Sequence, residues 1–409
     1  MIAGVAKAHA IVPALVLGAV AAAAGLTGAV PMTWDEGYTF LRISSHGLAA
    51  AFTTYPMPNN HVLFSGLEAL LPAQWIAHWP PLLRTFNVAF AAAMGAALGT
   101  VVSSPLLAIL LGLCAPIFTL YLVLARGYLI GTIFLLGAIV QADRARPLRA
   151  GLLAGLAVAC VPTFALALAG GSIALKSGRL RAAAVFAAVV AATYFAIAGE
   201  VFRQRSLWGT RPGLFLPGLI GFGHGPGQIV SMALLGIAAI LVAMQRPPAQ
   251  SLGLSLLASA AGFVALVVVL GPLGLLDEPY PRNALFVPLF GWLGLLLLAQ
   301  GRTRTAVAGL LGASAALGAV LLALAFRPGA DPNRYPYLRS LTPSPLQRSL
   351  SLDFDSMAGD SMLAGLYARH KPIRPLETIP SVCFAGSIRP EPAQTVVLYR
   401  DGAPLLLCY

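Results

Sequence analysis

Apolar stretches long enough to cross a lipid bilayer recur along this chain from residue 10 to about residue 326. A membrane-spanning helix needs about 20 mostly apolar residues. Charged residues make up only 10% of the 409 residues, whereas they make up about a quarter of a soluble globular protein. Backbone groups inside a bilayer must satisfy one another, so such stretches fold as helices. The sequence therefore predicts an all-α polytopic membrane protein.

Basic clusters divide the chain into spans, because cytoplasmic loops carry an excess of lysine and arginine. Lys7 and the clusters at 144–149, 176–181, 246 and 302–304 mark that side. About eleven spans fit these anchors: 10–30, 59–73, 83–101, 126–142, 149–161, 163–175, 181–199, 226–245, 251–271, 282–300 and 304–326. This layout predicts a multi-pass protein of a bacterial-type cytoplasmic (inner) membrane, with a cytoplasmic N-terminus. The same function of the basic clusters explains the net charge of +12 without nucleic-acid binding.

Two segments do not fit simple spans. Residues 104–122 are apolar enough to cross, but a crossing there would put the cluster at 144–149 on the wrong face. Pro116 interrupts this run, and we expect a broken or re-entrant segment that returns to the outer face before Ala125. The alternative is one extra span here and one missed elsewhere. The two runs around Pro162 are short and fit either two spans or a tight hairpin.

The end of the chain differs in composition from the rest. Residues 327–409 are polar, rich in proline and mixed in charge. We assign residues 1–326 to a transmembrane domain and 327–409 to a small extracytoplasmic domain of α/β or irregular structure. Cys383 and Cys408 both lie in this tail, where an oxidising compartment would allow a disulfide between them. Two unpaired thiols are the alternative.

Charged residues gather on the predicted outer face, where they contribute nothing to the positive-inside pattern. Acids there include the adjacent pair Asp35 and Glu36, and Glu68 lies in the second predicted span. The outer arginines include Arg84, Arg126, Arg203, Arg205 and Arg282. A guanidinium group suits phosphate oxygens, so we expect these arginines to bind an anion. Snorkelling toward lipid headgroups is the alternative for each of them.

This combination of charges predicts a transfer reaction at the membrane surface. A carboxylate can act as base on an acceptor hydroxyl while cations hold a leaving phosphate. The chain contains no GxxxxGK[ST] loop for ATP, and no HExxH or CxxC spacing supports a metal, although a divalent ion would be compatible with such a site. An ion pump or carrier would bury ionisable residues in mid-membrane, and only Glu68 is a clear candidate.

Five segments in one order resemble the integral-membrane GT-C glycosyltransferases, in the branch of the protein O-mannosyltransferases and the lipid A aminoarabinose transferases. They are "WDEGYTF", "YPMPNNHVLFSGLEALL", "PPLLRTFNVAFAA", "ARGYLIGTIFLLGAI" and "EPYPRNALFVPLF". The resemblance covers roughly residues 10–300. It implies a GT-C-like fold with juxtamembrane helices in the first outer loop.

The resemblance also implies roles for individual residues. Asp35 would be the catalytic base, with Glu36 beside it, and the donor would be a polyprenyl-phosphate sugar. The positions implied for donor and phosphate binding are Arg126, Arg282, Arg84, Arg203, Arg205, Tyr128, His61, Asn59 and Asn60. The acceptor would be a hydroxyl of a lipid, a glycan or a protein, which would attack the anomeric carbon of the sugar and invert its configuration. "PNNH" stands where relatives carry a Lys-Pro-Pro turn, so the mode of phosphate binding and the acceptor stay open.

Two other classes of function compete with the transferase. A transporter or flippase of a lipid-linked saccharide would use the same arginines without breaking a bond. It predicts an internal repeat, and residues 1–200 show no convincing repeat in 200–326. A membrane scaffold that presents the tail would not need Asp35.

Overall fold

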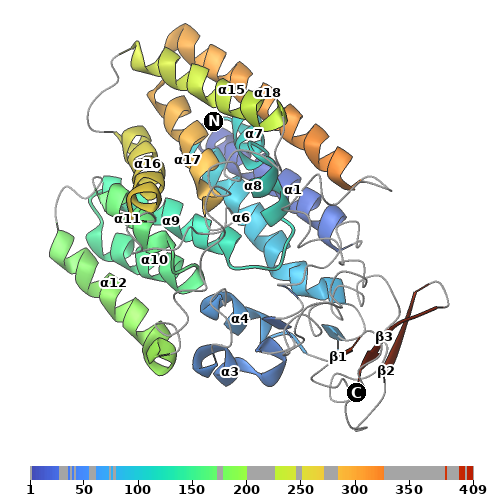
Figure 1. The fold of residues 1–409 in the computed structure, drawn as a ribbon. Coiled ribbons are helices and arrows are strands. Elements are labelled where there is room, and N and C mark those ends of the chain that lie inside the picture. The colour runs from blue at the N-terminus through green and yellow to red at the C-terminus, as the bar shows by residue number, and fades with distance from the viewer. Residues whose placement is uncertain are drawn as a thin grey trace.

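Helices make up nearly all of the chain that the computed structural model describes (Figure 1). The described residues are 2–26, 36, 39–40, 43–54, 61–72, 75–76, 80–172, 178–199, 226–245, 251–270, 284–326, 383–384, 396–400 and 403–408. In these ranges five helices are long and apolar enough to cross a membrane: Ala8–Gly25, Pro81–Val102, Arg179–Ile197, Leu252–Val269 and Gly301–Val320. The prediction of a mostly helical membrane protein is confirmed for this part of the chain. The number of eleven spans stays a prediction.

Short helices lie among the described residues from 43 to 84. They are η1 (Ser44–His46), α3 (Leu48–Thr53), α4 (Val62–Glu68) and η2 (Pro80–Arg84). α3 and α4 pack against each other, and they lie together at one end of the longer helices (Figure 1). Gly66 of α4 allows this contact, because a Cβ there would lie 3.2 Å from the ring of Phe52.

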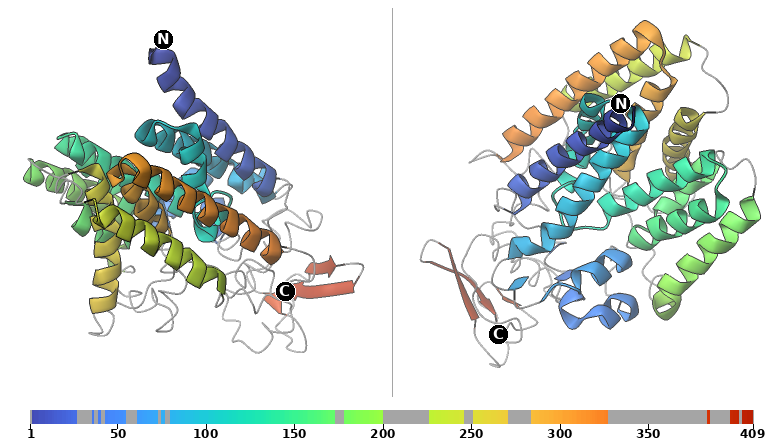
Figure 2. Two further views of the ribbon diagram at one scale, coloured as in Figure 1. Left: turned by 90° about the horizontal axis from the view of Figure 1, so that it is seen from above. Right: turned by 180° about the vertical axis from the view of Figure 1, so that it is seen from behind.

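The remaining helices begin and end, in most cases, close to the predicted apolar runs. They are α1 (Ile2–Gly25), α6 (Thr85–Val102), α7 (Pro105–Gly112), α8 (Pro116–Tyr121), α9 (Tyr128–Asp143), α10 (Pro147–Cys160), α11 (Phe164–Gly171), α12 (Arg179–Tyr194, continued by η4, Phe195–Ile197), α15 (Pro226–Ala243), α16 (Leu252–Leu270), α17 (Phe286–Leu298) and α18 (Gly301–Phe326). α15 and α18 run side by side along one edge, and α12 lies at the opposite edge (Figures 1 and 2).

Two features of this bundle explain its packing. α1 and α6 approach closely, because a Cβ added at Gly95 or Gly99 would overlap the backbone of α1. Small residues allow such close contact between membrane helices. α17 is buried on nearly all sides, and its Phe286 meets Phe164 and Phe263 edge-on at ring-centroid distances of 5.1 and 5.2 Å. A helix that is apolar all round belongs in the centre, and α17 contacts α15, α16 and α18 there.

The structure corrects one predicted span and confirms one predicted break. Residues 59–73 were expected to form the second span, but α4 within them has only seven residues and is too short to cross a bilayer. Its apolar side chains are buried against α3 and the neighbouring helices instead. In the run 104–122, α7 ends at Gly112 and α8 begins at Pro116. The predicted interruption at Pro116 is therefore present, whereas the re-entrant path stays a prediction.

The tail contributes three short strands, β1 (Cys383–Phe384), β2 (Val396–Arg400) and β3 (Ala403–Cys408). They form an antiparallel sheet in the order β1-β3-β2. The register places Cys383 directly opposite Cys408. Directly opposed residues of an antiparallel pair have Cα atoms about 4.5–5.5 Å apart, which lies within the range of disulfides. The backbone is therefore compatible with the predicted disulfide, which stays a prediction.

Candidate functional site

A buried ion pair joins the first loop to the beginning of α6. Arg84 donates from Nε to Oε1 of Glu36 and from Nη2 to Oε2, both at 2.8 Å. Glu36 is 0% exposed and Arg84 is 1% exposed. Two parallel hydrogen bonds from a guanidinium to a carboxylate fix both orientation and distance. The pair therefore holds residue 36 in one place relative to α6.

The same carboxylate also binds the turn that precedes α9. The backbone N–H of Ala125 donates to Oε1 of Glu36 at 2.7 Å, across 89 residues of chain. The next residue, Arg126, is 3% exposed and donates from Nη1 to the hydroxyl of Thr39 at 2.5 Å. Two bonds thus connect residues 36–39 with residues 125–126. The segment that bears the acidic pair and the "ARGY" segment are held against each other.

Asn87 of α6 fixes this turn from the other side. Its Nδ2 donates to the carbonyl oxygen of Tyr121 at 3.2 Å and also to that of Leu124. The residues between α8 and α9 are not helical, so their carbonyl groups need such partners when they are buried. The position of Arg126 is therefore determined by one amide and one carboxylate from distant parts of the chain.

Glu68 is the second buried acid of this region. It ends α4, which is not among the candidate membrane spans, and it is 0% exposed. Ser44 donates to its Oε2 at 2.9 Å, while its Oε1 has no hydrogen-bond partner among the described residues. Burial raises the pKa of the Glu68 carboxyl well above its usual range, and the hydrogen bond from Ser44 and the charge of Arg126 oppose this shift only in part. Burial thus favours the protonated form of Glu68, which can donate as well as accept.

His61 and Tyr128 are two further buried residues near the beginning of α9. Nδ1 of His61 lies 2.6 Å from the carbonyl oxygen of Cys160, which can only accept, so Nδ1 carries a proton. In the neutral ring the other nitrogen, Nε2, then has the lone pair. The His61 ring meets Tyr128 edge-on at 4.3 Å. Gly127 makes room for it, because a Cβ there would lie 2.8 Å from that of His61.

We call these residues the polar cluster: Glu36, Thr39, Ser44, His61, Glu68, Arg84, Asn87, Arg126 and Tyr128. All nine are buried. The arginines and acids of the cluster are Arg84, Arg126, Glu36 and Glu68, and burial raises the pKa of the Glu68 carboxyl. Guanidinium groups such as those of Arg84 and Arg126 suit an anionic group such as a phosphate.

The structure brings together five of the residues predicted to form the site: Glu36, His61, Arg84, Arg126 and Tyr128. Glu36 and Arg84 form an ion pair with each other, so neither side chain directs its charge at a ligand in this arrangement. Six further predicted site residues lie outside the described residues: Asp35, Asn59, Asn60, Arg203, Arg205 and Arg282.

Four members of the cluster were not among the predicted site residues: Thr39, Ser44, Glu68 and Asn87. Asn87 could have been found, because it is the one amide in the apolar run of α6. A buried side-chain amide within such a run usually has a specific partner. Thr39 lies in the "WDEGYTF" segment, three residues after Glu36, but nothing in the sequence indicates that it contacts Arg126.

No group of three or more His, Cys, Asp or Glu side chains that could hold a metal occurs among the described residues. The polar cluster instead combines two arginines with two acids, Glu36 and Glu68.

The comparisons with known proteins add no relative. No protein-family model matches the chain, and no curated protein and no solved structure matches it either. The resemblance to GT-C glycosyltransferases therefore rests on the five sequence segments alone, and the polar cluster is the structural basis for a function.

Proposed function

We propose that this chain is a membrane glycosyltransferase of the GT-C type. It moves a sugar from a polyprenyl-phosphate donor to a hydroxyl of a lipid, glycan or protein acceptor. The observation that carries this proposal is the carboxylate of Glu36, which binds Arg84 and the N–H of Ala125 at once. A transferase of this kind needs a base close to a cation that receives the leaving phosphate. Glu36 provides that proximity, because it joins the acidic segment to the Arg126 segment.

The proposal changes the roles of two residues. Glu36 accepts three hydrogen bonds and is fully buried, so we assign it a positioning role. Asp35, the preceding residue in the chain, stays the proposed base. Arg84 likewise becomes the counter-ion of Glu36. Arg126, which Glu36 and Asn87 hold in place through the preceding turn, is assigned to the phosphate. Arg282, Arg203 and Arg205 stay further candidates for that contact.

The reaction follows from these roles. Asp35 accepts the proton of the acceptor hydroxyl as its oxygen forms a bond to the anomeric carbon. The bond from that carbon to the phosphate oxygen breaks, and the polyprenyl phosphate leaves with the electron pair. Displacement from the opposite face inverts the anomeric configuration. Arginine side chains that are already in place stabilise the growing phosphate charge without rearrangement. Tyr128 follows Arg126 by two residues in the chain, its ring contacts that of His61, and we assign both side chains to contact with the sugar.

The membrane arrangement is part of the proposal. With about eleven spans and a cytoplasmic N-terminus, the polar cluster faces the outer side of a bacterial-type inner membrane. Residues 327–409 then form an extracytoplasmic domain, in which the sheet of β1, β2 and β3 lies. Sugar and acceptor would meet at that surface, since the lipid-borne donor is exposed there.

Mass spectrometry of lipids and surface glycans tests this function. A deletion strain is complemented with the wild-type chain, with Asp35→Asn or with Arg149→Gln, at matched expression. We expect one glycosylated species to disappear in Asp35→Asn while its unmodified acceptor and the sugar-phosphate lipid accumulate. The exposed Arg149 is a control that should restore the species. Full restoration by Asp35→Asn would exclude Asp35 as the base and favour a transporter or a scaffold.

A further inference from the structure

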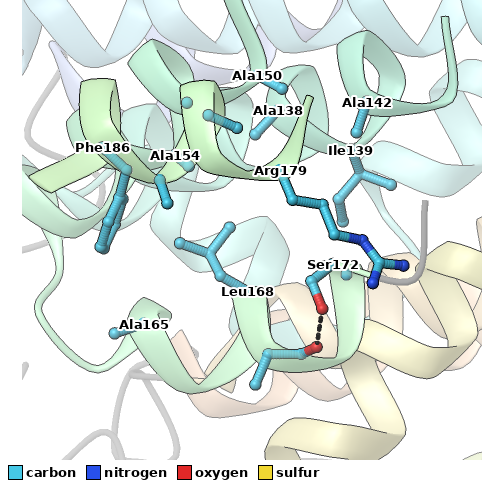
Figure 3. Close-up of a pocket in the computed structure, with 15 residues that line it drawn as sticks. Ala138, Ile139, Ala142, Ala150, Ala154, Ala165, Leu168, Ser172, Arg179 and Phe186 are labelled. Atoms are coloured by element: carbon cyan, nitrogen blue, oxygen red, sulfur yellow. Dashed lines mark hydrogen bonds between the residues drawn. The ribbon is translucent and has the colours of Figure 1, made fainter. Parts of the chain in front are cut away.

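A groove of about 420 Å³ lies between α9, α10, α11 and α12 (Figure 3), and no residue of the polar cluster lines it. Its walls are mainly alanine side chains, together with Ile139, Leu168 and Phe186. Among the residues that line it, only Ser172 and Arg179 have polar side chains, and Figure 3 shows them at the same end. The hydroxyl of Ser172 donates to the carbonyl oxygen of Ala169 at 2.7 Å. The groove therefore combines an apolar body with one cationic end.

The walls of the groove are held at a short distance by glycines. Gly151 of α10 touches the backbone of Ala182 in α12, since a Cβ at Gly151 would overlap it. One turn further on, a Cβ at Gly155 would lie 2.6 Å from the Cβ of Val189. Ala165, Ala169 and Ala183 are exposed, so the groove opens to the surface of the bundle. Its shape is therefore built into helix packing and is accessible from outside.

Arg179 lies where the edge of the membrane is expected. The candidate span Arg179–Ile197 has 19 residues and is only 17% buried within the protein. At 1.5 Å for each residue it is about 28 Å long, close to the roughly 30 Å of a hydrocarbon core. The side chain of Arg179, at its first residue, would thus reach the headgroup level while the alanine walls extend into the acyl region.

More positive charge surrounds this end of the groove. Gly178 packs against Pro147, because a Cβ there would lie 2.6 Å from the proline ring. The beginning of α12 therefore lies beside the loop from α9 to α10. Arg144, Arg146 and Arg149 in that region are all exposed. Asp143 is the one acid among them in the sequence. Basic pockets between membrane helices on the cytoplasmic side recognise anionic headgroups.

We propose that this groove binds one anionic phospholipid. Its acyl chain lies along the alanine walls, and its phosphate is bound by Arg179. Three observations favour this occupant: the apolar lining, a single cation at one end and the expected depth of that cation. A hydrophobic peptide would not need the cation. A soluble anion would not need the apolar groove. The inference does not depend on the glycosyltransferase proposal.

Native mass spectrometry of the full-length protein tests this site. The protein is delipidated in detergent and mixed with phosphatidylglycerol or with phosphatidylcholine of the same chain length. Arg179→Gln is compared with Arg181→Gln, which removes the same charge two residues away at an exposed position that does not line the groove. Ala183→Leu narrows the groove, and Ala184→Leu is its control at an exposed position outside the lining. All four positions are exposed, so folding should persist, and melting curves verify this.

We expect wild type to retain one phosphatidylglycerol and to release phosphatidylcholine. Arg179→Gln should lower the affinity for phosphatidylglycerol at least about tenfold, which corresponds to the loss of a charge-assisted hydrogen bond. Ala183→Leu should also weaken it, whereas the two controls should stay within about twofold, as expected for solvent-screened positions. Equal losses in Arg179→Gln and Arg181→Gln would overturn the site, since they would indicate a diffuse attraction. Equal retention of the two lipids, or preferential binding of an added polyprenyl phosphate, would overturn the occupant.

Discussion

The arginines at the two ends of α9 differ in burial. At its beginning, Arg126 and its neighbour Arg84 are buried, and a carboxylate and a hydroxyl group face them. At its end, Arg144 and Arg146 are exposed to the surroundings of the protein. The same residue type therefore serves two purposes within one helix length. The exposed arginines belong to the clusters that we expect to set the orientation of the chain in the membrane, while the buried ones require a specific arrangement of partners.

The burial of Arg84 and Arg126 indicates that their positions have a specific purpose. Removing a charge from water costs several kcal/mol for each ion, so a buried arginine persists only where its partners are well placed. An exposed arginine costs little and contributes little to stability. The difference in burial predicts that equal changes at the two ends will differ widely in effect. Arg84→Met and Arg149→Gln test this difference directly, and Gly151→Val and Glu68→Gln are expected to lie between them in effect.

Arg84→Met should be the most harmful of these changes. It leaves the carboxylate of Glu36 buried without its counter-ion, which typically costs roughly 3–5 kcal/mol. We expect a large loss of folded protein in detergent and a much lower melting temperature. The double variant Glu36→Leu/Arg84→Met should recover part of the loss, because it removes both charges, although the N–H of Ala125 then loses its acceptor and the carbonyl oxygen of Gly25 loses a donor. A double variant as unstable as the single one would contradict the ion-pair explanation.

Gly151→Val should cause the second-largest loss of stability, and it tests the close contact between α10 and α12 beside the groove. The new side chain would overlap the backbone of Ala182, and overpacking costs about 1–3 kcal/mol. We expect a lower melting temperature and weaker retention of phosphatidylglycerol, since α12 must move away from α10. Gly236→Ala in α15 is the control, because no described atom lies within 4 Å of a Cβ there. That variant should be neutral or slightly stabilised, in line with helix propensity.

Glu68→Gln should change the pH dependence of stability. Burial raises the pKa of Glu68 in the folded state, so the folded protein keeps a proton that the unfolded chain releases as pH rises. Stability should therefore fall with rising pH, from the ordinary carboxyl pKa up to the raised one, by about 1.4 kcal/mol for each pH unit. Glu68→Gln cannot ionise and should lose this part of the slope. Melting temperatures of both proteins from about pH 4 to 8 measure it, and parallel curves would contradict the assignment.

Arg149→Gln should have the smallest effect. Arg149 is exposed, and substitutions at such positions usually change stability by less than about 0.5 kcal/mol. The melting temperature should match wild type within error, in contrast to Arg84→Met. A large loss at Arg149 would show that burial does not separate the two ends of α9.

Apolar runs predicted the helices well where they are long. The expected spans 181–199, 251–271 and 304–326 agree with α12, α16 and α18 within a few residues at most ends. The failure at 59–73 has a physical cause. The pattern of a short apolar run does not distinguish a segment that faces lipid from one that is buried inside the protein. α4 is of the second kind, because protein buries it. Pro116, in contrast, indicated its break, because proline acts on the backbone itself.

The site was predicted in part. Charges on one predicted face drew attention to Glu36, Arg84 and Arg126, and the described structure joins all three. Their pairing could not be predicted, because Arg84 lies 48 residues and Ala125 lies 89 residues from Glu36 along the chain. The pairing of acidic and basic side chains depends on the fold and not on their spacing in the sequence. Asn87 shows the same limit, since its amide was visible in the sequence but its partners were not.

The assignment of Arg126 to the donor phosphate can be measured as binding of a polyprenyl phosphate to the purified protein in lipid nanodiscs. Wild type, Arg126→Gln and Arg149→Gln are compared by titration, after melting curves establish that each is folded. We predict that Arg126→Gln weakens binding at least about tenfold, while Arg149→Gln stays within about twofold. Wild-type affinity in a folded Arg126→Gln variant would contradict the role of the buried end of α9 as the phosphate site.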